Sequence, residues 1–137
     1  MKAYLNRRYH FSASHRLHAE SLTSEQNRLT YGKCNNPYGH GHNYTITVTF
    51  SGTVSLVTGM VTNLADLDAF AAQHLLSIFN ETNLNTIYPF AAVVPSTENL
   101  TLELHRIFQT YPDAQLENIH IEETSNNSFD YRTPPQP

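Results

Sequence analysis

The chain has 137 residues, the size of one domain, so a single unit over residues 1–137 is expected. Eight Lys and Arg residues against twelve Asp and Glu residues give a net charge of −4, which argues against binding to duplex nucleic acid or an anionic membrane. No apolar run reaches the ~18 residues of a membrane-spanning helix, and no export signal is visible. With one cysteine, Cys34, these features predict a cytoplasmic protein.

The first half of the chain predicts strands. Apolar residues alternate with polar ones over residues 3–11 and 44–50, and this period of two is typical of half-buried strands. Residues 12–42 show no period and are expected to form a long loop, of a kind that is usually functional or disordered. Residues 54–62 follow a turn and are expected to return as the second arm of a hairpin.

The second half predicts two helices and two further strands. Asn63 can cap a helix over residues 64–79, and Ser96 can cap a second amphipathic helix that ends near Tyr111. Strands are expected over residues 116–124 and 129–131. The order strand, strand, helix, helix, strand, strand predicts an α+β fold, with a four-stranded antiparallel sheet and both helices on one face. Ring-like oligomerisation would remove the two exposed edges of such a sheet.

Histidine is unusually frequent, with eight copies. His40 and His42 stand two residues apart at the start of a strand, so both project from the same face, and the flanking glycines leave room for a ligand. The third ligand of a metal would be His15, just beyond the first strand, with His18 as the competitor. Three neutral imidazoles with an open fourth position are typical of catalytic zinc sites. The alternative is that a glycine-rich turn simply tolerates these histidines.

Two further side chains can carry chemistry. Cys34 lies in a polar loop beside Lys33, and it could act as a thiolate base or nucleophile, close a zinc site as a fourth ligand, or be a small buried side chain. Glu123 falls on the same strand face as Ile119 and Ile121, where an apolar side chain is expected. A carboxylate there needs a partner, and a ligand with two adjacent N–H groups would suit it. The alternative is an exposed glutamate at a strand end.

Several segments together resemble a known family. They are FSASHRL, CNNPYGHGHNY, GMVTNLADL, PSTENL and EETSNN, and their order and spacing are similar to those of the 6-pyruvoyltetrahydropterin synthase and 6-carboxytetrahydropterin synthase family. CNNPYGHGHNY is closer to the pyruvoyl-forming members. The resemblance implies the tunnelling fold (ββααββ), a zinc-dependent carbon–oxygen lyase acting on phosphates, and a homohexamer of two stacked trimers with active sites between subunits.

The resemblance also implies roles for particular residues. Thr97 and Glu98 would lie near a neighbouring subunit's site and contribute to substrate binding. The resemblance implies that the zinc ligands are His15, His40 and His42. It also implies that Cys34 abstracts the proton and that Glu123 anchors the pterin.

One position departs from the family pattern. An Asp-His pair normally completes the proton relay with the cysteine, but this chain has Asn80 and Glu81 there. Asn80 cannot ionise, and Glu81, as a carboxylate, is a poor acid at neutral pH. The zinc and pterin residues are therefore intact while the relay is changed.

Three functions follow. The first is conversion of 7,8-dihydroneopterin triphosphate to 6-pyruvoyltetrahydropterin by triphosphate elimination and side-chain rearrangement. The second keeps the substrate but forms the 6-carboxy product of queuosine synthesis, or cleaves the side chain. The third is a zinc- and pterin-binding paralogue with little catalysis, because of Asn80 and Glu81. Arg16, Arg28 and Lys33 are all plausible contacts for the triphosphate.

Overall fold

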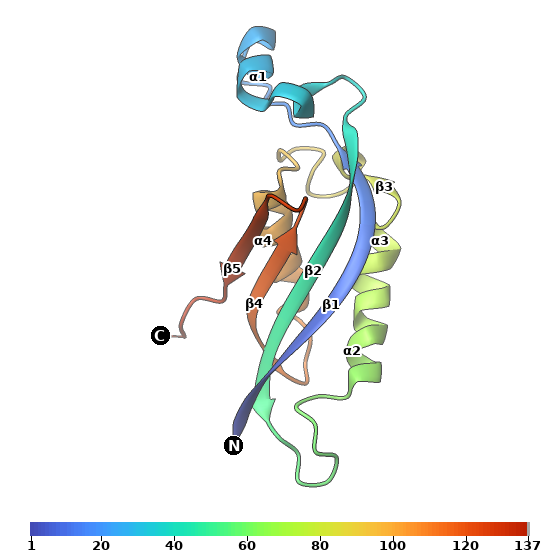
Figure 1. Ribbon diagram of the computed structural model, residues 1–137, viewed down its shortest axis with the longest axis vertical. Coiled ribbons are helices and arrows are strands. Elements are labelled where there is room, and N and C mark those ends of the chain that lie inside the picture. The colour runs from blue at the N-terminus through green and yellow to red at the C-terminus, as the bar shows by residue number, and fades with distance from the viewer. Residues whose placement is uncertain (137) are drawn as a thin grey trace.

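The computed structural model describes residues 1–136 and contains a five-stranded sheet in the order β3-β1-β2-β4-β5 (Figure 1). The pairs β1·β2, β2·β4 and β4·β5 are antiparallel, whereas β1·β3 is parallel. The sheet is therefore mixed. The strands are β1 (Lys2–His15), β2 (His40–Thr53), β3 (Thr82–Asn83), β4 (Gln115–Glu122) and β5 (Ser128–Arg132).

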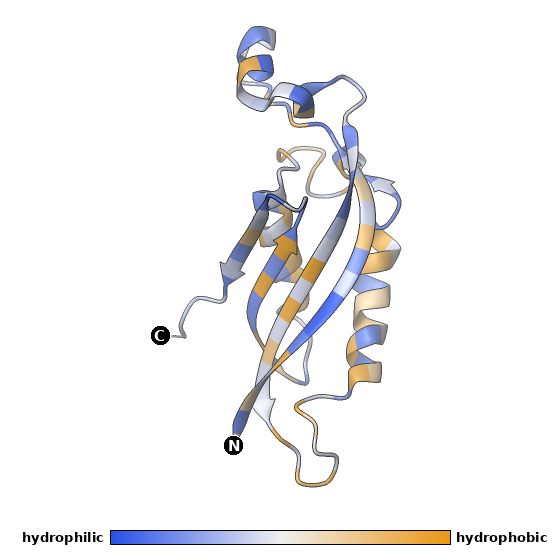
Figure 2. Cartoon of the chain, viewed as in Figure 1, coloured by the Kyte–Doolittle hydropathy of each residue, from blue (hydrophilic) through white to orange (hydrophobic). Residues whose placement is uncertain are grey.

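The two longest strands form the centre of the sheet. β1 and β2 pair along their full lengths, from Lys2 opposite Thr53 to His15 opposite His40. Their apolar residues alternate with polar ones, as Figure 2 shows, so one face of the ribbon is buried and the other is polar. The strands predicted over residues 3–11 and 44–50 are confirmed as β1 and β2, and both extend further toward the histidines than expected.

Both predicted helices are also confirmed. The first is continuous and consists of α2 (Leu64–Ala71), a π-helical segment η2 (Ala72–Leu76) and α3 (Ser77–Phe79). It begins where predicted, since the Asn63 side chain accepts a hydrogen bond of 2.8 Å from the Ala65 N–H. The second is α4 (Thr97–Phe108), and the Ser96 hydroxyl accepts from the Asn99 N–H at 3.2 Å.

The helices pack on the apolar face of the sheet. Phe11 of β1 lies 6.3 Å from Phe79, and Tyr9 lies 6.4 Å from Phe108, between ring centroids. The helices add fully buried leucines to this core, while the opposite face of the sheet keeps its polar side chains. The helices on one face are as expected for an α+β fold.

The segment between the first two strands is more ordered than expected. It contains α1 (Ser24–Tyr31) and a 3₁₀ turn, η1 (Gly32–Asn35), so the prediction of a long loop was wrong there. Thr23 and Gln26 form a capping box, a local signal that the hydrophobic pattern did not reveal. The pattern failed because Asn27 is the only residue that α1 buries. In Figure 1, α1 stands away from the rest of the molecule.

Two other expectations were wrong. Residues 54–62 form a turn closed by a hydrogen bond from the Gly59 N–H to the Ser55 carbonyl, not a strand. A strand there could not pair with β2, because β1 and β4 occupy both of its edges. The sheet also has a fifth strand, β3, which is followed by the 3₁₀ turn η3 (Leu84–Thr86) and lies between the two predicted helices, where no strand was expected. Within residues 1–136, no helix is long and apolar enough to cross a membrane.

Candidate metal and substrate site

Three imidazole rings meet at one end of the central ribbon. His15 ends β1 directly opposite His40, which begins β2, and His42 lies two residues further along on the same face. The ring centroids are 5.4 Å apart for His15 and His40, 4.9 Å for His15 and His42, and 4.7 Å for His40 and His42. The strand register therefore brings all three predicted ligands together.

Two ring nitrogens of the cluster are buried and form no hydrogen bond in the described part of the chain. Nδ1 of His15 donates to the Pro95 carbonyl at 2.8 Å, so the lone pair of this ring is on Nε2. Nε2 of His15 and Nε2 of His42 are both buried and form no hydrogen bond within residues 1–136. Burial lowers the pKa of His15 and of His42, which favours the neutral form that a metal requires. These groups fit a metal ion with nitrogen ligands.

Gly39 is required for this geometry. Its φ is +67°, in the left-handed region, and a Cβ on this residue would lie 2.3 Å from the carbonyl oxygen of His15. The backbone before His40 can pass His15 closely only because this side chain is absent. Gly41 has no such constraint, since a Cβ there would be 3.8 Å from the nearest backbone atom, the Ala13 carbonyl oxygen.

Cys34 lies beside the histidine cluster. Its Sγ is 3.5 Å from Nε2 of His40, and one potential ligand atom from each of His15, Cys34 and His40 lies within 4.8 Å of the others. Burial raises the pKa of the Cys34 thiol, and the negative charge of Glu123 raises it further. A positive charge in the cluster would oppose both effects and favour the thiolate.

Glu123 faces the cluster from the end of β4, as the sequence pattern indicated. Its Oε1 lies 3.1 Å from Nε2 of His42, and its Oε2 accepts a hydrogen bond from the hydroxyl of Thr97. The carboxylate is only 14% exposed, so the exposed alternative is wrong. Thr97 is itself buried at the start of α4 and holds the carboxylate in place, whereas Glu98 is exposed.

Sequence reasoning missed two groups of this site. Tyr44 was expected only as an apolar residue of the alternating strand over residues 44–50, yet its buried hydroxyl has no hydrogen-bond partner in the described chain, and its ring centroid lies 5.7 Å from that of His42. Its place one step beyond His42 on the same face of β2 was the available signal. The Pro95 carbonyl was also missed, because a backbone acceptor leaves no trace in residue type.

The competitor of His15 lies elsewhere. His18 is in contact with the side-chain amide of Asn35, at 3.2 Å from Nδ1, and with Glu20, at 3.7 Å from Nε2. It belongs to neither cluster of potential metal-ligating side chains.

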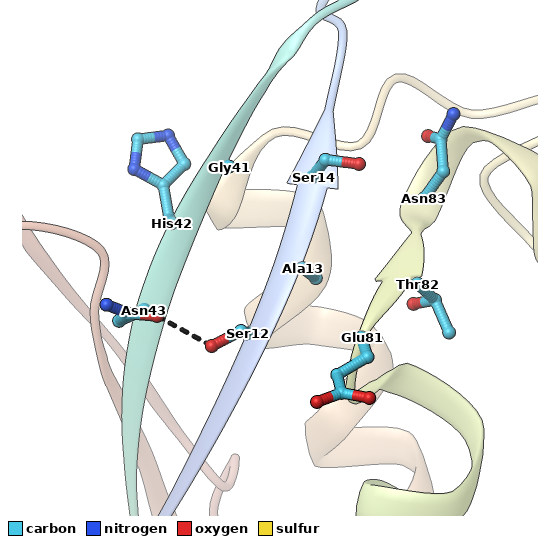
Figure 3. A pocket seen from close by; sticks show the side chains of 9 residues that line it. All are labelled: Ser12, Ala13, Ser14, Gly41, His42, Asn43, Glu81, Thr82 and Asn83. Carbon is cyan, nitrogen blue, oxygen red and sulfur yellow. Dashed lines mark hydrogen bonds between the residues drawn. The ribbon is translucent and has the colours of Figure 1, made fainter.

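Asn80 and Glu81 lie at the edge of β1. The Ser12 N–H donates to Oδ1 of Asn80 at 2.9 Å, and the Glu81 N–H donates to the Ser12 carbonyl at 2.5 Å. Glu81 has a φ of +57° and lines an open pocket of about 450 Å³ with Ser12 and Asn43. In Figure 3, its carboxylate and the His42 ring lie on opposite sides of the two strands. No hydrogen bond within residues 1–136 joins either residue to Cys34.

The arrangement combines three imidazoles, an adjacent thiol and a largely buried carboxylate on the apolar face of an α+β sheet. Such a site can hold a metal, exchange a proton and accept hydrogen bonds from a heterocycle. It defines the chain as a candidate metal-dependent enzyme that acts on a small nitrogen-containing ring.

Comparison with known proteins identifies the family. Residues 4–134 match the family model for 6-pyruvoyl tetrahydropterin synthase, so the chain belongs to this family. A protein from Poecilia reticulata and one from Homo sapiens, both named 6-pyruvoyl tetrahydrobiopterin synthase, are 44% and 41% identical to it. These matches cover 94% and 96% of this chain, and 89% and 92% of the relatives.

A solved structure agrees with this assignment. The 6-pyruvoyl tetrahydropterin synthase of Caenorhabditis elegans superimposes with a TM-score of 0.92 and 34% identity, over 98% of this chain and 97% of the other. The observed mixed sheet and its helices are therefore a fold shared with this enzyme family.

Proposed function

We propose that the chain is a zinc-dependent enzyme of the 6-pyruvoyltetrahydropterin synthase type. It converts 7,8-dihydroneopterin triphosphate by eliminating triphosphate and rearranging the side chain. The observation that carries the proposal is the convergence of two buried nitrogens beside Cys34: Nε2 of His15, which has no hydrogen-bond partner within residues 1–136, and Nε2 of His42, which lies 3.1 Å from the Glu123 carboxylate. The family membership and the names of the relatives support it.

His15, His40 and His42 would hold the zinc ion, and Pro95 would orient His15 through its Nδ1. Bound there, zinc supplies a Lewis acid that polarises an oxygen of the substrate side chain and makes the adjacent C–H more acidic. Burial lowers the pKa of His15 and of His42, which favours the neutral form that binds zinc.

The other residues bind the substrate and move its protons. Glu123 accepts hydrogen bonds from adjacent N–H groups of the pterin, and Thr97 fixes the orientation of its carboxylate. Cys34, next to His40, removes the proton from the side-chain carbon. We assign Glu81 as the second proton-exchanging group, whereas Asn80 has a structural role, because its side chain already binds the Ser12 N–H.

Assembly would complete the site. We propose a homohexamer of two stacked trimers, in which Glu98 and the Asn80-Glu81 pair approach a neighbouring subunit's site, whereas Thr97 contacts Glu123 of its own chain. Two free sheet edges support a ring: β5 has one neighbour, and the outer edge of β1 pairs only through Ala13 and Ser14.

A cytoplasmic location and one domain over residues 1–137 belong to the same proposal. The two other functions, a 6-carboxy or side-chain-cleaving enzyme and a non-catalytic paralogue, are not favoured by the relatives' names.

The test is direct. Zinc-loaded protein is incubated anaerobically with 7,8-dihydroneopterin triphosphate and Mg²⁺, and the released triphosphate and the pterin product are followed by mass spectrometry. We expect 6-pyruvoyltetrahydropterin. A 6-carboxy product would move the protein to the queuosine branch, and unchanged substrate with pterin binding confirmed by fluorescence would support the non-catalytic paralogue.

A further inference from the structure

A second cavity has Asn35, the residue after Cys34, in its lining. It has a volume of about 420 Å³ and lies between α1 and the segment that follows Cys34. Arg16 and Arg28 both line it, and Glu25 is the one carboxylate among its lining residues. No ion pair within residues 1–136 joins either arginine to Glu25 or to another acid. The cavity therefore has a surplus of positive charge.

This concentration is unusual in a chain with a net charge of −4. Three of its eight Lys and Arg residues form ion pairs with acids in the described chain, namely Lys2, Arg7 and Arg106. Of the remaining five, Arg16 and Arg28 line the cavity, and Lys33 lies in the turn between α1 and Cys34. Two of these five cations therefore line one cavity, and a third follows the lining residue Gly32 in the sequence.

Hydrogen bonds hold this charge close to the thiol. Nε of Arg16 donates to the Asn35 carbonyl at 3.1 Å, and the Asn35 side chain donates to the Leu17 carbonyl at 2.8 Å. The Leu17 N–H in turn donates to the Cys34 carbonyl at 2.7 Å. One nitrogen of the Arg16 guanidinium is thus fixed one residue from Cys34, and its terminal nitrogens remain available to a ligand.

The polar groups form a chain of contacts with a definite order. It runs from the Glu123 carboxylate to His42, 3.1 Å away, through the imidazole cluster to Cys34, 3.5 Å from His40, and then by way of Asn35 to Arg16. A molecule with a hydrogen-bonding ring at one end and an anion at the other would match this order. The substrate in the proposed function has its ring, its reacting carbons and its triphosphate in the same sequence.

We propose that the Arg16–Arg28 cavity binds the triphosphate end of the substrate, an inference that rests on the proposed function. Guanidinium groups suit it because they bind phosphate oxygens through two parallel N–H donors and keep their charge at any physiological pH. In the elimination, the carbon–oxygen bond to the triphosphate breaks and its electron pair leaves with the oxygen, while Cys34 removes the proton. The two arginines stabilise the negative charge that develops on this leaving group.

The test uses inorganic tripolyphosphate as the probe. Its binding is measured by titration calorimetry on the protein as purified and again after the metal is removed. We expect Arg16→Gln and Arg28→Gln each to weaken binding about tenfold, since each removes charge-assisted hydrogen bonds. Glu25→Gln, which removes the opposing carboxylate, is expected to strengthen binding. The matched control is Arg8→Gln, which changes the charge equally at an exposed arginine of β1.

Arg28 is exposed, and no hydrogen bond of its side chain is found in residues 1–136, so Arg28→Gln tests the charge without disturbing the fold. Arg16→Lys keeps the positive charge at the anchored position but loses the paired N–H donors of the guanidinium, so we expect it to weaken binding less than Arg16→Gln. Equal losses in all the arginine variants, Arg8→Gln included, would overturn the proposal, as would binding that disappears with the metal.

Turnover separates the two proposals. If the enzyme is active, KM for the pterin triphosphate should rise in Arg16→Gln and Arg28→Gln but not in Arg8→Gln, and unchanged KM would overturn the assignment of the cavity. If no pterin is turned over but tripolyphosphate still binds through both arginines, the polyphosphate site stands and the proposed function fails.

Discussion

His15 donates a hydrogen bond of 2.8 Å from Nδ1 to the carbonyl oxygen of Pro95, which leaves its buried Nε2 directed at the other two histidines. This contact joins the end of β1 to the residue just before the Ser96 cap of α4. Because the ring is held in one tautomer and one orientation, we expect His15 to be indispensable for metal binding.

His15→Ala is therefore expected to reduce bound zinc from about one ion per chain to nearly none, since catalytic zinc sites need three protein ligands. The measurement is the metal content of purified protein by plasma mass spectrometry. His18→Ala is the matched control, because His18 contacts Asn35 and Glu20 instead of the cluster. Loss of zinc in His18→Ala, with retention in His15→Ala, would contradict the assignment.

Cys34→Ala tests the role of the thiol. If Cys34 abstracts the proton, turnover should fall by about 10²–10⁴-fold, the usual contribution of a general base, while zinc content stays the same. Product formation and metal content are measured on the same preparation. Loss of zinc in the variant would instead make Cys34 a ligand, an arrangement that its position within 4.8 Å of His15 and His40 also allows.

Gly39→Ala and Gly41→Ala form a matched pair on either side of His40. The first places a methyl group 2.3 Å from the His15 carbonyl oxygen at a φ of +67°, whereas the second meets its nearest neighbour at 3.8 Å. We expect Gly39→Ala to lower the free energy of unfolding by about 2–4 kcal/mol and to reduce zinc binding. Urea denaturation of both variants checks this, and equal stabilities would show that the close approach does not matter.

Glu81 has a φ of +57°, a conformation that glycine adopts without steric cost. Glu81→Gly is expected to raise the free energy of unfolding by about 1 kcal/mol and to lower turnover, if the carboxylate exchanges protons. The double change Asn80→Asp and Glu81→His is expected to increase turnover. An unaltered rate in the double variant would remove position 81 from the relay.

His105, which lies outside the candidate site, is expected to make the free energy of unfolding depend on pH. It is buried in α4 and donates from Nε2 to the Thr133 hydroxyl at 2.8 Å, and burial lowers its pKa from the ordinary 6.5. The unfolded chain therefore takes up the proton first, so this contribution to stability is complete above about pH 6.5 and is lost as the pH falls below it.

His105→Gln keeps a donor for Thr133 but cannot titrate. The stability advantage of the wild type over this variant should shrink between pH 7.5 and 5.5, by at most about 1.4 kcal/mol per pH unit. Denaturation curves at several pH values measure it. Parallel curves for both proteins would rule out the titration of His105 as a cause.

The parts of the fold that follow from hydrophobic periodicity could be predicted from the sequence. The two central strands and the helices capped by Asn63 and Ser96 each bury one apolar face, and the spacing of apolar residues in the sequence predicts that face. α1 buries only Asn27, and β3 is two residues long, so neither carries a periodic signal. The capping box of Thr23 and Gln26 is the local signal of α1, and the prediction of a loop over residues 12–42 missed it.

The candidate site was predicted to a similar extent. The period of two placed His40 and His42 on one face, and the apolar partners of Glu123 on its strand face showed that its carboxylate turns inward. The choice of His15 over His18 depended on how far β1 continues, which the alternation alone did not settle. The contact between Thr97 and Glu123 joins segments 26 residues apart, and no local pattern contains it.

Because His15 is paired with His40 across the two strands, the three candidate ligands come together only when β1 and β2 are in the correct register. A slip of β1 by one residue relative to β2 would turn Ser14 or Arg16 toward the cluster in place of His15. A metal held by all three rings would bind only the correctly aligned ribbon, so it would favour that alignment over every shifted one by mass action. Removing the ion would then lower the free-energy gap between the native sheet and its misaligned forms, in addition to taking away a catalyst.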